Sequence, residues 1–144
     1  MPQPIPYLGF NGKCAEAMRF YAKVLGGKLG MMTVGQSPMA SQCPPDRRGD
    51  IMHARLELDD GFSLYATDCT PPGVTYQGIH GVTLSLNYDT VEQAERVFNA
   101  LGEGGKITMP FSDTFWARKF GMLTDRFGCH WIINGELQDI PLGD

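Results

Sequence analysis

The residues best suited to chemistry alternate with apolar ones in a single run, IMHARLELDD, over residues 51–60. In a β-strand, such alternation places His53, Arg55 and Glu57 on one face and the apolar residues on the other. A histidine can act as general acid or base when a carboxylate orients it, and an arginine can hold a carboxylate or phosphate through two parallel bonds. The run therefore predicts a strand whose polar face lines a site, or else a solvated strand surface without chemistry.

A second group of candidates is aromatic and lies in the segment TFWARKFGMLTDRFGCHWIIN, residues 114–134. Phe115, Trp116 and Phe120 lie on or beside a short irregular connection, where aromatic rings could stack on a flat or apolar ligand. Packing in the core or in a dimer is the alternative, and we favour it for Phe115 and Phe120. Trp116 is predicted to form part of a pocket wall.

The composition describes a soluble globular protein. The chain has 144 residues, of which 42% are hydrophobic and 19% charged, which is enough for one core. A net charge of −4 without a basic stripe argues against a nucleic-acid partner. No run approaches the roughly 18 apolar residues of a membrane helix, so no membrane partner is expected. The N-terminus MPQPIPYLGF has no basic segment followed by an apolar one, so we expect a cytoplasmic location.

The chain repeats one arrangement at a fixed offset of 78 residues, since FYAKVLGGKL at 20–29 corresponds to FNALGEGGKI at 98–107. Apolar residues at helical spacing predict helices from Cys14 to Leu25 and from Val91 to Leu101, each followed by a glycine pair. Extended runs around them give the order β-α-β-β-β twice. We therefore predict a single domain, residues 1–144, in which residues 5–68 and 79–135 are duplicated modules.

The modules differ by an insert in the first, QSPMASQCPPDRRGD, residues 36–50. Its prolines and small polar residues predict a loop rather than a helix or strand. Loops of this length within a compact domain usually serve as lids or interface arms. A substrate lid and a dimer-contact arm are both open interpretations.

These motifs resemble those of a known group of proteins. FYAKVLGGKL, HARLEL and above all DTFWARKFGMLTDRFGCHWIIN are similar to the vicinal oxygen chelate superfamily of glyoxalase I, extradiol dioxygenases and bleomycin resistance proteins. Within it they resemble the PhnB-like branch, whose members are labelled 3-demethylubiquinone-9 3-methyltransferase. The resemblance implies an α+β fold in which two βαβββ modules form a curved mixed β-sheet cup with the helices outside. It also implies a small-molecule ligand in the cup and a homodimer.

In the glyoxalase-type members that the sequence resembles, the cup holds a divalent metal, with one ligand from the first and last strands of each module. At the corresponding positions this chain has Pro6, Tyr65, Gly81 and Ile132. None of these is an ordinary ligand for magnesium, nickel, zinc or iron. We therefore expect no metal and no other cofactor, although a nonstandard divalent metal site using His53 and His130 stays open.

Strand alternation then assigns the side chains that would line the cup and those that would pack under the helices. The predicted catalytic residues are His53, Tyr65 and Glu57. The predicted ligand-binding residues are Arg55, Trp116, Phe10, Thr67, Ser85, His130 and Asn134. The predicted helix-facing core residues are Met52, Ala54, Leu56, Leu58, Leu64, Ala66, Val82, Leu84, Trp131 and Ile133.

The function expected from these residues is binding of a small molecule without the usual divalent metal, with catalysis left open. A cup needs only aromatic walls and a few hydrogen-bonding groups for this role. One alternative is a metal-dependent lyase, isomerase or dioxygenase of the same superfamily. The other is a methyltransferase, as relatives are labelled. It is disfavoured because Gly104-Gly105 ends a predicted helix instead of opening one after a strand, as a cofactor-binding glycine loop would.

Overall fold

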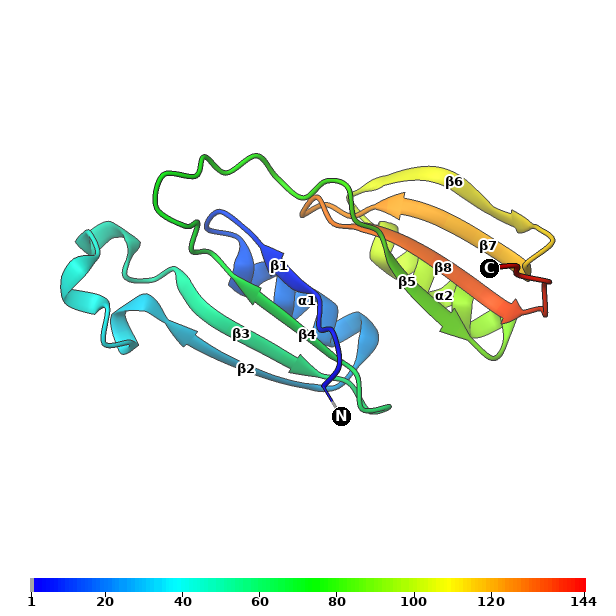
Figure 1. The fold of residues 1–144 in the computed structure, drawn as a ribbon, viewed down its shortest axis with the longest axis horizontal. Coiled ribbons are helices and arrows are strands. Elements are labelled where there is room, and N and C mark those ends of the chain that lie inside the picture. The colour runs from blue at the N-terminus through cyan, green and yellow to red at the C-terminus, as the bar shows by residue number, and fades with distance from the viewer. Residues whose placement is uncertain (1) are drawn as a thin grey trace. The chain divides into compact units, whose positions relative to one another are not determined.

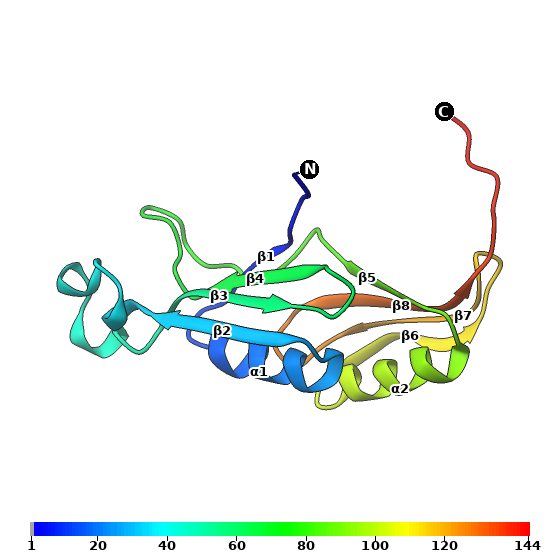
Figure 2. The same ribbon diagram turned by 90° about the horizontal axis from the view of Figure 1, so that it is seen from below.

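The computed structural model describes residues 2–144 and divides into two compact units, one ending at Ile79 and the other beginning at His80. Each unit is a mixed four-stranded sheet with one helix along one face (Figures 1 and 2). The opposite face of each sheet carries no helix and is called the open face below. No helix within residues 2–144 is long and apolar enough to cross a membrane.

The first unit places its strands in the order β1-β4-β3-β2, with β1 parallel to β4 and the other pairs antiparallel. Its elements are β1 (Tyr7–Gly9), α1 (Cys14–Leu25), β2 (Lys28–Thr33), β3 (Ile51–Glu57) and β4 (Ser63–Thr67). The segment between β2 and β3, which includes the insert predicted as a loop, holds short 3₁₀ turns, namely η1 (Val34–Gln36), η2 (Ala40–Gln42) and η3 (Pro45–Arg47). The first of them forms because Thr33 caps it, accepting a hydrogen bond from the backbone N–H of Gln36 at 3.2 Å.

The second unit repeats this plan with the order β5-β8-β7-β6, in which β5 is parallel to β8 and the other pairs are antiparallel. Its elements are β5 (Leu84–Tyr88), α2 (Val91–Gly102), β6 (Lys106–Asp113), β7 (Ala117–Thr124) and β8 (His130–Leu137). The predicted α+β class with two βαβββ modules is confirmed. Helix α1 spans the predicted residues, and α2 runs one residue further than predicted.

Each helix packs on its sheet through one apolar stripe. The buried residues of the two helices are Cys14, Ala17, Met18, Phe20 and Tyr21 in α1, and Ala94, Phe98 and Leu101 in α2. Their spacing of three and four residues places most of each set on a single helix face. The amphipathic pattern in the sequence thus fixes which face of each sheet is covered.

Gly27 and Gly105, at equivalent places after the two helices, let the chain pass close to the sheet. A Cβ at Gly27 would clash with the carbonyl oxygen of Glu57, and one at Gly105 with that of Thr124. Gly27 also has a φ of +91°, in the left-handed region that favours glycine. The second glycine of each pair predicted as a helix stop is therefore also required by a close backbone approach.

Strand alternation identified most of the helix-facing core. Leu64, Ala66, Trp131 and Ile133 are buried as predicted. Val82 was placed wrongly in the core, because β5 begins only at Leu84 and Val82 is 57% exposed.

Met52 was also placed wrongly in the core. The register between β2 and β3 shifts between Met32 and Thr33, so that Thr33 pairs with Ile51. Ile51 is consequently buried, and Met52 is only half-buried. A bulge of this kind changes which face a side chain occupies, and simple alternation does not reveal it.

Candidate functional site

A row of residues crosses the open face of the first sheet. The strand registers place Tyr7 beside Tyr65 and Tyr65 beside Arg55. On the far side of Arg55 the register places Gly30. Residues paired across neighbouring strands share a face, so the row runs over all four strands opposite α1.

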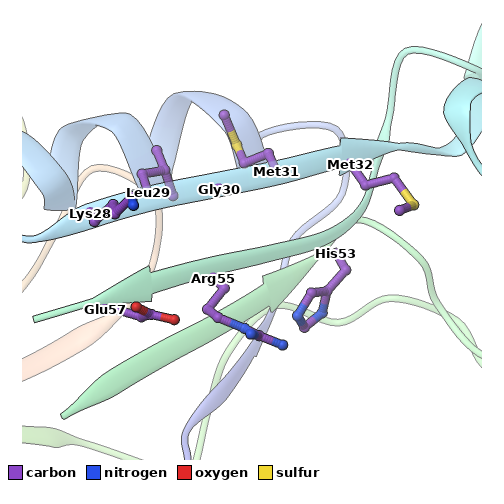
Figure 3. Close-up of a pocket in the computed structure, with 8 residues that line it drawn as sticks. All are labelled: Lys28, Leu29, Gly30, Met31, Met32, His53, Arg55 and Glu57. Atoms are coloured by element: carbon purple, nitrogen blue, oxygen red, sulfur yellow. The ribbon is translucent and has the colours of Figure 1, made fainter. Parts of the chain in front are cut away.

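A hollow of about 390 Å³ lies beside this row, over β2 and β3. Figure 3 shows His53, Arg55 and Glu57 on one side of β3, while Leu29 and Met31 point toward α1. The hollow is lined by Lys28, Leu29, Gly30, Met31, Met32, His53, Arg55 and Glu57. Gly30, which pairs with Arg55, has no side chain, and a Cβ built on it would meet nothing within 4 Å. The space beside Arg55 is therefore open. The volume suits a small molecule.

Two tyrosines hold His53. The hydroxyl of Tyr7 lies 2.9 Å from its Nδ1 atom, and the ring of Tyr65 packs edge to face against it, with centroids 5.0 Å apart. Tyr7 is 55% exposed as a whole, yet partial burial raises the pKa of its hydroxyl, with smaller contributions from the thiols of Cys69 and Cys14. The phenol therefore keeps its proton at neutral pH and can donate it to Nδ1.

Arg55 lies over the ring of Tyr65, with its guanidinium carbon 5.1 Å from the ring centroid, within the range of a cation–π contact. Within residues 2–144 no hydrogen bond or ion pair uses this exposed guanidinium. The nearby carboxylate of Glu57 is placed directly across from Lys28 in the β2–β3 pairing, where opposite charges attract. Arg55 therefore offers its donors to a ligand.

The structure gathers four of the predicted site residues on this face, namely His53, Tyr65, Arg55 and Glu57. Thr67 shares their strand parity, but its hydroxyl donates to the carbonyl of Met52 at 2.7 Å and accepts from the backbone N–H of Cys69. Phe10 lies in the core with 2% of its surface exposed. Thr67 and Phe10 thus hold the scaffold beside the site.

The predicted residues of the second unit form a separate group around a buried amide. Trp116 donates from its indole N–H to Oδ1 of Asn134 at 2.9 Å, and Asn134 donates to Oδ1 of Asn87 at 2.9 Å. Ser85 donates to the same Asn87 oxygen at 3.3 Å. Asn134 is only 5% exposed. These polar groups satisfy one another, so they leave fewer atoms for a ligand than the first unit does.

Trp116 also packs on Phe120, with ring centroids 4.5 Å apart, and Phe120 is buried. Phe115 meets the edge of Trp116 but is 73% exposed. The last predicted residue, His130, has its Nδ1 atom 2.8 Å from the hydroxyl of Thr124. In this unit the aromatic cluster covers part of its own open face.

The positions that carry the metal ligands in glyoxalase-type proteins do not supply a donor set here. Tyr65 offers a phenol, Ile132 offers only hydrocarbon, and Gly81 has no side chain. The carbonyl of Pro6 accepts a hydrogen bond from the backbone N–H of Tyr65 at 2.9 Å. Within residues 2–144 no three His, Cys, Asp or Glu side chains gather to hold an ion. These residues therefore do not fit a divalent metal.

Sequence reasoning missed four residues of the site. Lys28, Gly30 and Met32 line the hollow, and Tyr7 contacts His53. The duplication contained a signal for Tyr7, because the offset of 78 residues aligns it with Ser85, which was assigned to the cup. The residues of β2 carried no such signal. Their place depends on the β2–β3 register, which pairs Met32 with His53.

Comparison with known sequences connects this geometry to a family. The sequence model of the 3-demethylubiquinone-9 3-methyltransferase family matches residues 2–134. The chain belongs to this family. Protein YjdN of Escherichia coli (strain K12) is 37% identical to it over 141 residues, covering 90% of this chain and 92% of YjdN.

Solved structures agree with the family assignment. Protein PA1353 from Pseudomonas aeruginosa has 48% identity and a TM-score of 0.86, covering 96% of this chain and all (100%) of that one. A Bacillus cereus protein described as a putative 3-demethylubiquinone-9 3-methyltransferase, PhnB protein, has 25% identity and a TM-score of 0.71, covering 93% and 99% of the two chains. The predicted PhnB-like branch is confirmed.

The wider fold also agrees. A glyoxylase/bleomycin resistance protein/dioxygenase domain from Frankia has a TM-score of 0.63 at 13% identity, covering 97% of this chain and 95% of that domain. At this identity the likeness concerns the fold alone. The PhnB-like family member described here thus has the fold of the vicinal oxygen chelate superfamily, as the sequence motifs predicted.

Proposed function

We propose that the protein binds a small molecule on the open face of its first unit, through His53, Arg55 and Tyr65, without a divalent metal. The observation that carries this proposal is the row of aromatic and cationic side chains beside a hollow of about 390 Å³. Small-molecule sites usually combine an apolar or aromatic lining with a few convergent polar groups. This face has both.

The chemistry of the face favours binding and orientation. The ring of Tyr65 contacts both His53 and Arg55, and these contacts help to hold the two polar groups in place. Side chains that are already ordered lose less entropy when a ligand binds. His53 and Glu57 also have the chemistry to move a proton to or from a bound molecule.

The two alternatives receive less support. A metal-dependent lyase, isomerase or dioxygenase needs ligands that Pro6, Tyr65, Gly81 and Ile132 do not offer. The family carries a methyltransferase name, but the pair Gly104-Gly105 follows the end of α2. A glycine loop that holds a phosphate or nucleotide opens a helix, where the backbone N–H groups point at the anion.

A thermal-shift screen of metal-stripped protein against small organic molecules tests the proposal. Hits should stabilise the wild type by about 2.7 kcal/mol at a concentration one hundred times their Kd. Arg55→Met and His53→Phe should lose this stabilisation, whereas Arg19→Met, on the exposed surface of α1, should keep it. Hits that appear only after zinc, nickel, manganese or magnesium is added would contradict the metal-free proposal.

A further inference from the structure

The open face of the first unit offers hydrogen-bond donors in excess of acceptors. The Arg55 guanidinium has five N–H donors and no acceptor, and within residues 2–144 it makes no hydrogen bond or ion pair. His53 lies two residues away on the same face of β3, about 7 Å along the strand. A ligand that satisfies both residues must therefore present acceptors.

The contact between Tyr7 and His53 bears on which imidazole nitrogen is the donor. The Tyr7 hydroxyl lies 2.9 Å from Nδ1, and a protonated hydroxyl donates to this nitrogen or accepts from it according to the tautomer of the ring. With Tyr7 as the donor, the single N–H of the neutral imidazole is on Nε2. Within residues 2–144 no other hydrogen bond uses the ring of His53. In this tautomer Nε2–H is available to the hollow.

The local charge adds to this preference. The hollow contains the cations Lys28 and Arg55 and the anion Glu57. Two cations and one anion give this lining a formal charge of +1. The chain as a whole carries −4, so this positive face is unlike the average surface.

We propose that the ligand is a small organic carboxylate, whose oxygens accept from the Arg55 guanidinium and from Nε2–H of His53. Tyr7 is a positioning residue that fixes the tautomer of His53. The planar fork of arginine matches the two oxygens of a carboxylate. The thioether of Met32, which lines the hollow, and the ring of Tyr65, which contacts both His53 and Arg55, provide apolar surface for the carbon body of the ligand. The inference rests on the proposed binding function and names its ligand class.

Isothermal titration with matched probes tests the ligand class. Benzoate should bind saturably, and benzamide, which has the same shape without the charge, should bind at least about tenfold more weakly. Arg55→Met should lose about tenfold in benzoate affinity, Arg55→Lys should lose less, and Arg19→Met should lose nothing.

Equal binding of benzoate and benzamide would overturn the carboxylate inference while leaving small-molecule binding intact. Tighter binding of inorganic phosphate than of benzoate would also overturn it. Absence of binding by every probe and every screened molecule would overturn both proposals.

The tautomer of His53 can be read directly from the ¹⁵N chemical shifts of its imidazole. The wild type should show the proton on Nε2, and Tyr7→Phe should increase the Nδ1–H form and weaken benzoate binding several-fold. His130, in the other unit, provides an internal control whose signals should not change. A His53 already protonated on Nδ1 in the wild type would overturn the role of Tyr7, as would an unchanged tautomer in Tyr7→Phe.

Discussion

The two units share one backbone plan and differ in what their open faces carry. In the first unit the cross-strand row contains Tyr7, Tyr65 and Arg55. The equivalent register positions of the second unit hold Ser85, Ile132 and Met122. Helix-facing residues pack against a helix in both units, whereas the residues of this row do not. The comparison teaches that a duplicated scaffold can keep its fold while only one copy carries a row of aromatic and cationic groups.

The units also hold their helices in different ways. In the first, the buried carboxylate of Asp68 accepts from the backbone N–H groups of Gly12, Cys14 and Ile51 at 2.8–3.0 Å. In the second, Glu136 accepts from the N–H of Val91 at 3.1 Å. A carboxylate from the end of the fourth strand thus caps the helix in both units, but the first cap makes more bonds.

The largest expected effect comes from breaking the shared scaffold. Gly27→Ala should destabilise the protein by about 3 kcal/mol or more, because the new Cβ clashes with the carbonyl of Glu57 and φ is positive. Gly105→Ala should cost somewhat less, since it carries the clash alone. Urea unfolding measures the loss of stability in both variants.

Gly9→Ala, where nothing lies within 4 Å of a Cβ, is the control and should change stability by less than about 0.5 kcal/mol. A Gly27→Ala variant as stable as this control would contradict the packing account.

The unequal caps predict the next effect. Asp68→Asn should lower the free energy of unfolding by about 2–3 kcal/mol, because an amide N–H₂ would face backbone donors in a buried place. Glu136→Gln should cost about 0.5 kcal/mol, since it still offers one oxygen to a single N–H. Equal losses in urea unfolding would show that the two caps are equivalent.

A smaller effect, specific to the first unit, concerns alkaline stability. Burial raises the pKa of the Cys14 thiol to about 12, with a further contribution from the nearby carboxylate of Asp68. In the unfolded chain the thiol ionises at its ordinary, lower pKa, so its contribution to stability is complete below that value and is lost as pH rises toward 12. Above about pH 9, the wild type should lose about 1.4 kcal/mol per pH unit more than Cys14→Ala. Parallel unfolding curves for the two proteins from pH 8 to 11 would contradict this account.

Much of the fold could be predicted from the sequence because its signals are local. Helical spacing identified both helices, and the alternation around His53 identified the polar face of β3. Features that depend on long-range register could not be predicted in this way. The bulge that moves Ile51 into the core and the pairing that leaves Gly30 opposite Arg55 are set by how β2 meets β3. Trp116 was recognisable as unusual, but its hydrogen bond to Asn134 requires the folded β8.

The most direct test of the central claim is an NMR titration of the metal-free protein after its backbone amides have been assigned. The added ligands are benzoate and the strongest hits of the screen. Our account predicts saturable shifts at Tyr7, Gly30, His53, Arg55 and Tyr65, with the amides around Trp116 and Asn134 unaffected. Shifts confined to the second unit would contradict it, because they would place the ligand on the face whose polar groups already satisfy one another.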